Sequence, residues 1–146
     1  MDLEFKKATK ETQFKEIYEH NLDAFTDTPD FRWNLEEIKK EVKDGWELYS
    51  AYFNGEVIAA LFVKLDKSDL LTKNTALKMS HQGSGFSHQI KEFFEHIAEE
   101  KHANRVLHYC RIDNFRLYSL NESHGYSKTG KTLDGGQVVE WEKTLA

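Results

Sequence analysis

Hydrophobic and polar residues alternate along the chain with two different periods, and the changes of period divide it into predicted helices and strands. After a short extended start at residues 3–8, apolar residues recur every three or four positions over 14–25, which predicts a helix with one buried face. A second helix is predicted from Asn34, with Glu37 at capping-box spacing, to about Gly45. The chain therefore opens with one strand and two helices.

β-Branched and aromatic residues dominate the next segment, 46–65, and indicate strands. Asn54-Gly55 interrupts this segment and is typical of a type I′ hairpin turn, because these residues accept positive φ angles. Residues 57–63 are apolar at every position, as expected for a strand that is covered on both faces. Helices are therefore predicted on both faces of the sheet.

The second half of the chain continues the interleaving of strands and helices. The expected elements are a strand over about 70–79, a glycine-containing turn, a helix that runs to about Lys101, a strand over 105–112, a short helix over 114–124 and a terminal hairpin over 126–145. We predict a single domain that spans residues 1–146. Its fold class is α/β (α+β), with a mixed central sheet of six or seven strands.

The composition limits the classes of protein to which the chain can belong. Hydrophobic residues make up 39% and charged residues 31% of 146, with one proline, which describes a folded soluble protein. The net charge of -5 and the scattered Lys and Arg residues argue against a nucleic-acid partner. No apolar run approaches the roughly 20 residues that cross a bilayer, so no membrane association is expected. The single Cys110 and the absence of signal-peptide features predict a cytoplasmic protein.

A glycine-containing turn between a predicted strand and a predicted helix is the first candidate for ligand binding. It reads Gln82-Gly83-Ser84-Gly85-Phe86-Ser87. Free amides and the positive end of the helix dipole favour a phosphate group at this place, and glycines allow the backbone to approach it closely. The turn lacks the Lys-Ser/Thr pair of a P-loop and the spacing of the dinucleotide fingerprint. The alternative is that the glycines only shape a tight turn.

This turn resembles the Gln/Arg-x-x-Gly-x-Gly/Ala signature of the GNAT acyltransferase superfamily, with Ser87 at the last small position. Downstream, Asn114 is followed eleven residues later by Gly125 and then Tyr126. That spacing is similar to the asparagine-led helix of the same family, which ends in Gly-Phe or Gly-Tyr. The predicted order of elements also resembles the GNAT fold over nearly the whole chain.

The resemblance implies an acyl-CoA-dependent N-acyltransferase that moves an acetyl group from acetyl-CoA directly to the amine of a small molecule or peptide. It implies that the amides of Gln82, Gly83, Ser84, Gly85, Phe86 and Ser87 bind the coenzyme A diphosphate. The strand edge at Leu77 and Met79 would contact pantetheine and polarise the thioester carbonyl. Asn114 and Asn121 complete the expected cofactor-binding set. A homodimer is implied by the resemblance alone.

The residues that would transfer protons are marked less clearly. The family's usual acid is a tyrosine four residues before the glycine of the second motif, where this chain has Asn121. Tyr118, three residues earlier, is the candidate acid, and a packing tyrosine is the alternative. His108 is the candidate base because its ordinary pKa lies near neutrality, and a core histidine is the alternative. Glu47 and Tyr49 are weaker candidates.

The remaining histidine and aspartate residues give weaker indications of a functional site. The histidines lack the spacing and acidic partner of a zinc site, so no metal is expected. The acceptor amine is expected between the first helices and the terminal hairpin. Asp23, Asp27 and Asp30 fall where the resemblance implies an acceptor-binding loop, between the first two helices, and they either attract a cationic amine or form a solvated loop. Because Asn121 replaces the usual tyrosine, a catalytically inactive GNAT-like module that binds coenzyme A or regulates stays open as the alternative function.

Overall fold

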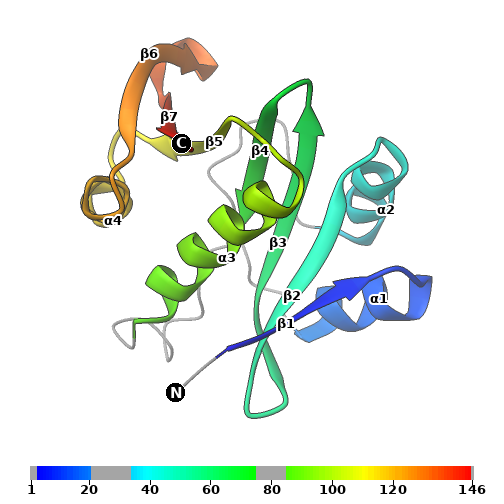
Figure 1. Cartoon of the computed structure of the whole chain (residues 1–146). Helices are drawn as coiled ribbons and strands as arrows, with labels where there is room; N and C mark the ends of the chain where they lie inside the picture. Colours follow the sequence, from blue (N-terminus) through cyan, green and yellow to red (C-terminus); the bar gives the residue numbers. More distant parts are fainter. Residues whose placement is uncertain (1–2, 21–33, 75–84, 146) are drawn as a thin grey trace.

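The computed structural model describes residues 3–20, 34–74 and 85–145, whose strands form one sheet (Figure 1). The elements are β1 (Glu4–Ala8), α1 (Glu11–His20), α2 (Leu35–Lys43), β2 (Glu47–Phe53), β3 (Glu56–Asp66), β4 (Asp69–Asn74), α3 (Phe86–Glu100), β5 (Arg105–Arg111), α4 (Phe115–Ser123), β6 (Ser127–Leu133), a 3₁₀ turn (Asp134–Gly136) and β7 (Val138–Thr144). The strand order is β1-β2-β3-β4-β5-β7-β6. This sheet confirms the predicted number of strands and their mixed arrangement.

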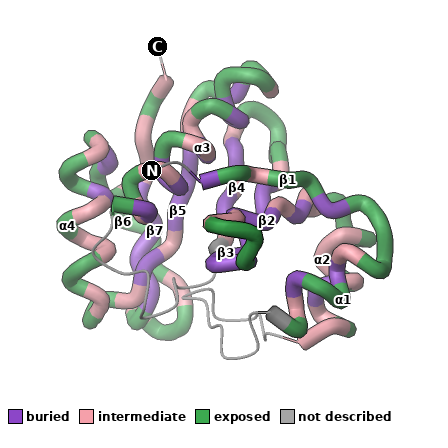
Figure 2. The backbone as a smooth tube through the Cα atoms, turned by 90° about the horizontal axis from the view of Figure 1, so that it is seen from below, coloured by how far each residue is buried: buried purple, intermediate pink, exposed green. Residues whose placement is uncertain are grey.

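Helices cover both faces of the sheet, as predicted. On one face, Ile17 of α1 and Ile38 of α2 pack against Phe62 and other residues of β2 and β3. On the other face, Phe94 and neighbouring residues of α3 form a second core with β3, β4, β5 and β7, and α4 packs against this core. Figure 2 shows the buried positions concentrated in the strands between these helices. No helix within the described ranges is long and apolar enough to cross a bilayer.

Strand β3 lies at the centre of both cores. Each residue from 57 to 63 is at most 1% exposed, which confirms the prediction of a strand that is covered on both faces. Ala51 pairs with Ala59 and Tyr52 pairs with Val57, so Ile58 is an extra residue in β3. This bulge turns Ile58 and Ala59 toward the same core although they are consecutive.

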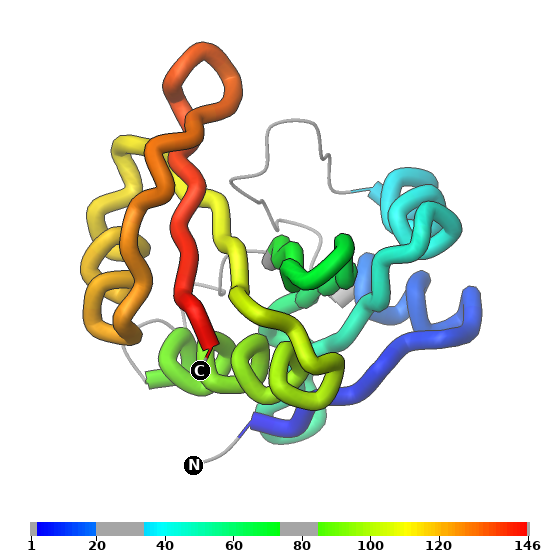
Figure 3. The backbone as a smooth tube through the Cα atoms, turned by 45° about the horizontal axis from the view of Figure 1, so that its top comes forward, coloured from blue at the N-terminus to red at the C-terminus, as the bar shows by residue number. Residues whose placement is uncertain are grey.

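The turns and the helix cap that the sequence predicts are present in the structure. Asn54 and Gly55 both have positive φ, 52° and 76°, in the β2–β3 turn. The Asn34 side chain accepts a hydrogen bond from the Glu37 amide at 2.8 Å and caps α2. The terminal hairpin turns at Asp134–Gly136, and β7 lies between β5 and β6 (Figure 3).

Strands β4 and β5 form the one parallel pair among the described strands, and their pairing is short. It covers three residue pairs, which are Asp69–Arg105, Leu70–Val106 and Leu71–Leu107. At the next position the Thr72 hydroxyl donates to the Leu107 carbonyl at 2.6 Å and also contacts Nδ1 of His108. β5 continues to Arg111 in register with β7, so the two strands diverge from Thr72 onward.

The core on the α3 face should carry much of the stability. Phe94 is 0% exposed, whereas Phe115 on α4 is 73% exposed. We expect Phe94→Ala to lower the free energy of unfolding by about 3 to 5 kcal/mol, because it leaves a cavity that the surrounding residues cannot fill. Phe115→Ala is the matched control and should change it by less than about 0.5 kcal/mol. Urea denaturation measures both values, and equal losses would contradict this assignment of the core.

Candidate functional site

The start of α3 has the features of an anion-binding helix N-terminus. Its N-cap, Gly85, is exposed and has left-handed φ and ψ angles of 81° and 2°. A Cβ atom at this position would meet no described atom within 4 Å, so the glycine is favoured by its backbone angles and not by crowding. The first turn carries no acidic side chain, and the cap makes no side-chain hydrogen bond. A phosphate group fits these conditions.

Part of the predicted diphosphate-binding turn lies in this helix start and part lies beyond it. Phe86 is 1% exposed and its ring centre lies 4.9 Å from that of Phe53, so its side chain belongs to the core and only its backbone can serve a ligand. Ser87 is half-buried in the first turn of the helix. The predicted residues Leu77, Met79, Gln82, Gly83, Ser84, Asp23, Asp27 and Asp30 lie outside the described residues.

Both asparagines of the second motif lie at α4. Asn114 is the N-cap, and its side chain accepts a hydrogen bond from the Leu117 amide at 3.2 Å. Asn121 is 0% exposed, and within the described ranges neither atom of its amide group has a hydrogen-bond partner. A buried amide without a partner costs about 1 to 3 kcal/mol, so this position fits a polar group of a ligand.

Tyr118 lies on the side of α4 that covers the terminal hairpin. Its ring meets Trp141 of β7 edge-on with ring centres 5.1 Å apart, and the ammonium group of Lys128 on β6 lies 4.7 Å from its ring centre. Burial raises the pKa of Tyr118, with a further contribution from Cys110. These contacts favour the packing interpretation, and its role as the acid stays a prediction.

His108 lies inside the core on the α3 face of β5. It is 3% exposed, and its ring centre lies 5.2 Å from that of Phe94 and 4.7 Å from that of Tyr126. Burial, aided by Lys91 and His124, holds the pKa of His108 well below its ordinary value. Of the two interpretations, this placement favours a histidine that packs in the core. A catalytic role for His108 stays a prediction.

A buried lysine that the sequence analysis missed lies next to His108. Lys91 of α3 is 4% exposed, and burial lowers its pKa to about 7, against the opposing effect of Cys110 and Glu95. Its ammonium nitrogen lies 5.0 Å from the ring centre of Tyr126. The sequence held a signal, because Lys91 precedes Phe94 by three residues and therefore lies on the buried stripe of the helix.

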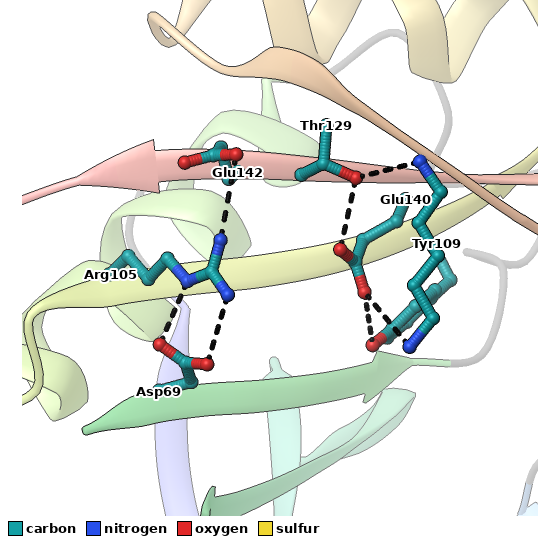
Figure 4. Close-up of polar contacts among 7 residues, drawn as sticks. Asp69, Arg105, Tyr109, Thr129, Glu140 and Glu142 are labelled. Atoms are coloured by element: carbon teal, nitrogen blue, oxygen red, sulfur yellow. Dashed lines mark hydrogen bonds and ion pairs between the residues drawn. The ribbon is translucent and has the colours of Figure 1, made fainter. Parts of the chain in front are cut away.

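The opposite face of β5 carries a polar cluster of different character (Figure 4). Side chains alternate along a strand, so Tyr109 points away from the α3 core that holds His108. Its hydroxyl donates to Oε2 of Glu140 at 2.9 Å, and the Thr129 hydroxyl donates to Oε1 of the same carboxylate at 3.0 Å. Glu140 is 5% exposed. The available signal was an acidic residue at 140 among the apolar residues of β7.

On the same face an ion cluster joins the starts of β4 and β5 to β7 (Figure 4). Arg105 donates from Nε to Oδ1 of Asp69 at 2.8 Å and from Nη2 to Oδ2 at 3.1 Å. Its Nη1 lies 3.5 Å from Oε2 of Glu142. The hydrogen bonds from Arg105 lower the pKa of Asp69, against the opposing effect of burial. This cluster holds the three strands together before β4 and β5 diverge.

The weaker base candidates do not join these residues. Glu47 pairs with Lys101 at 2.9 Å and with Lys7 at 3.5 Å, and the Tyr49 hydroxyl donates to Glu47 at 3.4 Å. Lys101 follows the last residue of α3, whereas Gly85 precedes the first. A 15-residue helix is about 22 Å long, so Glu47 and Tyr49 lie at the far end of α3 from the predicted diphosphate site.

Comparison with solved structures identifies the fold. No family model and no curated protein matches the sequence. The ribosomal-protein-S18-alanine N-acetyltransferase from Escherichia coli superposes with a TM-score of 0.79 at 14% identity, over 99% of this chain and 95% of that one. The PaiA N-acetyltransferase from Thermoplasma acidophilum, in complex with coenzyme A, gives 0.78 at 14%, over 99% and 100%. A GNAT family acetyltransferase from Elizabethkingia anophelis, with acetyl-CoA bound, gives 0.75 at 18%, over 98% of both chains.

These similarities cover 98% or more of this chain, and all three of these proteins are named as acetyltransferases. The protein therefore has the GNAT acetyltransferase fold, as the two sequence motifs and the order of elements predicted.

The buried Lys91 predicts an unusual dependence of stability on pH. Its pKa is about 7 in the folded protein against an ordinary 10.5, so between these pH values the unfolded chain binds the extra proton. Stability from this group therefore rises as pH increases from 7 to about 10.5, and the penalty is complete below pH 7. We expect Lys91→Met to be more stable than wild type by about 2 to 4 kcal/mol at pH 7.

Urea denaturation at pH 7 and at pH 10 measures this difference, which should shrink at the higher pH. Lys15→Met is the matched control, because the Lys15 side chain is 65% exposed and should give a difference near zero at both values. A Lys91→Met protein that is less stable than wild type at pH 7 would contradict the prediction.

Proposed function

We propose that the protein is an acyl-CoA-dependent N-acyltransferase that transfers an acetyl group from acetyl-CoA directly to the amine of a small molecule or peptide. The observation that carries the proposal is the combination of two features in one fold. β4 and β5 diverge after Leu71–Leu107, and α3 begins with an exposed glycine cap and carries no acidic side chain in its first turn. Structures with this fold from other organisms hold coenzyme A or acetyl-CoA.

The residues of this chain fit such a donor. The amides around Gly85 and Ser87 suit its diphosphate. The side-chain amide of Asn121, which has no hydrogen-bond partner among the described residues, suits a polar group of the pantetheine arm. Backbone groups on the diverging edges of β4 and β5 suit the amides of that arm, because buried backbone groups need hydrogen-bond partners. When bound, acyl-CoA supplies an activated acyl thioester. The chain then has to orient an amine and accept its proton.

A second candidate function is a module with this fold that binds coenzyme A and transfers nothing. Two observations favour it. Asn121 stands at the position of the family's usual acid, and Tyr118, the substitute, packs on Trp141. The two candidates share the binding site and differ in the transfer step.

Binding of the donor is tested by thermal-shift titration with acetyl-CoA and with coenzyme A. A ligand that binds only the folded state must raise the apparent melting temperature with dose. We expect a dose-dependent rise for wild type and at least a tenfold weaker response for Gly85→Ala, because the added methyl group occupies open space beside the helix amides.

Gly55→Ala is the matched control for this experiment. Gly55 has a similar φ, 76° against 81°, and a Cβ there also meets no described atom within 4 Å. Both variants should lose about 1 kcal/mol of stability, and only Gly85→Ala should lose binding. No thermal shift in wild type would overturn the proposal. A shift without release of coenzyme A thiol across a panel of amines would favour the second candidate.

A further inference from the structure

Glu140 is a buried carboxylate held by hydroxyl groups. Both of its oxygens accept hydrogen bonds, one from Tyr109 and one from Thr129. The cation nearest to it within the described ranges is Lys131, 3.9 Å away, whose side chain is 61% exposed and therefore well screened by water. A buried carboxylate is costly when no close cation compensates its charge. Structural stability alone gives a poor account of this arrangement.

The neighbouring ion cluster shows the contrast. Asp69 and Glu142 share Arg105, which approaches both within 3.5 Å, so their charges are compensated directly. Arg105 has no hydrogen bond to Glu140 among the contacts of the described residues. The same face of the sheet thus holds one compensated cluster that joins strands and one carboxylate that accepts hydrogen bonds from two hydroxyl groups and has only an exposed lysine at 3.9 Å as its ion-pair partner among the described residues (Figure 4).

Tyr109 lies where an acceptor amine is expected to reach the donor. It is the second residue of β5 beyond the last β4–β5 pair, at Leu107, so it lies on the diverging part of the strand. Asp69 and Lys73 of β4 share one side of that strand, since they are four residues apart, and Lys73 pairs with Glu41 of α2 at 2.8 Å. Tyr109 shares its side of β5 with Arg105, the partner of Asp69. It therefore faces the side of the sheet that α2 covers.

The chemistry of the pair suits a relay. Tyr109 is half-buried, and its hydroxyl donates to the buried carboxylate of Glu140. Burial and the hydrogen bond to Glu140 raise the pKa of Tyr109 above its ordinary value, which keeps the phenol protonated at neutral pH. A phenol that stays protonated cannot be the base itself, but it can accept one proton while it passes its own to the carboxylate behind it.

We propose that Tyr109 and Glu140 form the proton relay for the acceptor amine in the N-acyltransferase reaction. Tyr109 is the catalytic residue, and Glu140 acts through it. As the bond between the amine nitrogen and the acyl carbon forms, a proton passes from nitrogen to the Tyr109 oxygen, and the Tyr109 proton passes to Oε2 of Glu140. The carbon–sulfur bond breaks, and the proton returns through Tyr109 to the departing thiolate, which leaves as a thiol. The inference rests on the proposed function.

The relay is tested by the variants Tyr109→Phe and Glu140→Gln. Phenylalanine keeps the ring and removes the proton carrier, while glutamine keeps a hydrogen-bond acceptor for Tyr109 and cannot take the proton. Thiol release from acetyl-CoA is measured with spermidine, tyramine and a tripeptide with an N-terminal alanine as acceptors. We expect kcat to fall at least about 100-fold in both variants, the usual scale of a general base. The dissociation constant of acetyl-CoA, measured by calorimetry, should stay within about twofold of wild type.

Tyr49→Phe is the matched control. Tyr49 also lies on a strand, is also half-buried and also donates its hydroxyl to a glutamate, but at the far end of α3. Its loss should leave kcat unchanged within about twofold.

The dependence of rate on pH separates the relay from a structural role. Among the described residues, the charged groups around the pair include Arg105 on β5, Glu142 on β7, Lys131 on β6 and Asp69 on β4. If Glu140 takes the proton, the acidic limb of the kcat/KM profile disappears in Glu140→Gln. A structural role would lower the melting temperature and acetyl-CoA affinity and leave the limb in place.

Different results contradict the proton relay and the N-acyltransferase activity. If the wild-type protein acetylates an amine and Tyr109→Phe keeps kcat within about threefold of wild type, the relay is wrong and the proposed N-acyltransferase activity stands. Wild type that binds acetyl-CoA and releases no thiol with any of the three amines overturns both.

Discussion

The architecture depends on the short parallel contact between β4 and β5. Three residue pairs hold the two halves of the sheet together, and the Asp69–Arg105–Glu142 cluster strengthens them on one face. At the fourth position the Thr72 hydroxyl donates a hydrogen bond to the Leu107 carbonyl, and the backbone pairing of β4 with β5 ends there. From there β5 follows β7, so the halves separate without breaking either part of the sheet.

That separation creates two chemically different environments along one strand. On the α3 face, burial lowers the pKa of both His108 and Lys91 and so favours their uncharged forms. On the α2 face, Arg105 compensates two carboxylates, while Glu140 relies on hydroxyl donors. The difference in how charge is compensated, and not the number of polar groups, distinguishes the structural cluster from the proposed relay.

Much of the fold was predictable from local signals. The Asn54-Gly55 turn, the Asn34 cap and the apolar run at 57–63 each specify one conformation by elementary sterics or burial, and each formed as expected. The strand predicted over 70–79 is described as far as Asn74. Half of the predicted diphosphate-binding turn, residues 82–84, lies outside the described residues, so its role stays a prediction.

The side-chain cluster of the site was much harder to predict. Tyr109 and Glu140 are 31 residues apart and meet only because β5 pairs with β7 in one register. Lys91 breaks the usual rule that lysine is exposed, and helical periodicity was the one signal that placed it inside. Glu47 and Tyr49 were plausible by residue type, and the length of α3 separates them from the predicted site. Long-range register, which local patterns do not encode, explains these differences.

The alternation of side chains along β5 has a consequence for how such a protein can diversify. His108 and Cys110 belong to the interior on one side, while Tyr109 faces the other. Because neighbouring positions on a strand point to opposite sides, an inherited change at one position can alter the chemistry of its own side and leave the packing of the other side intact. The chemistry of the α2 side and the stability of the α3 core can therefore change separately within a single seven-residue strand.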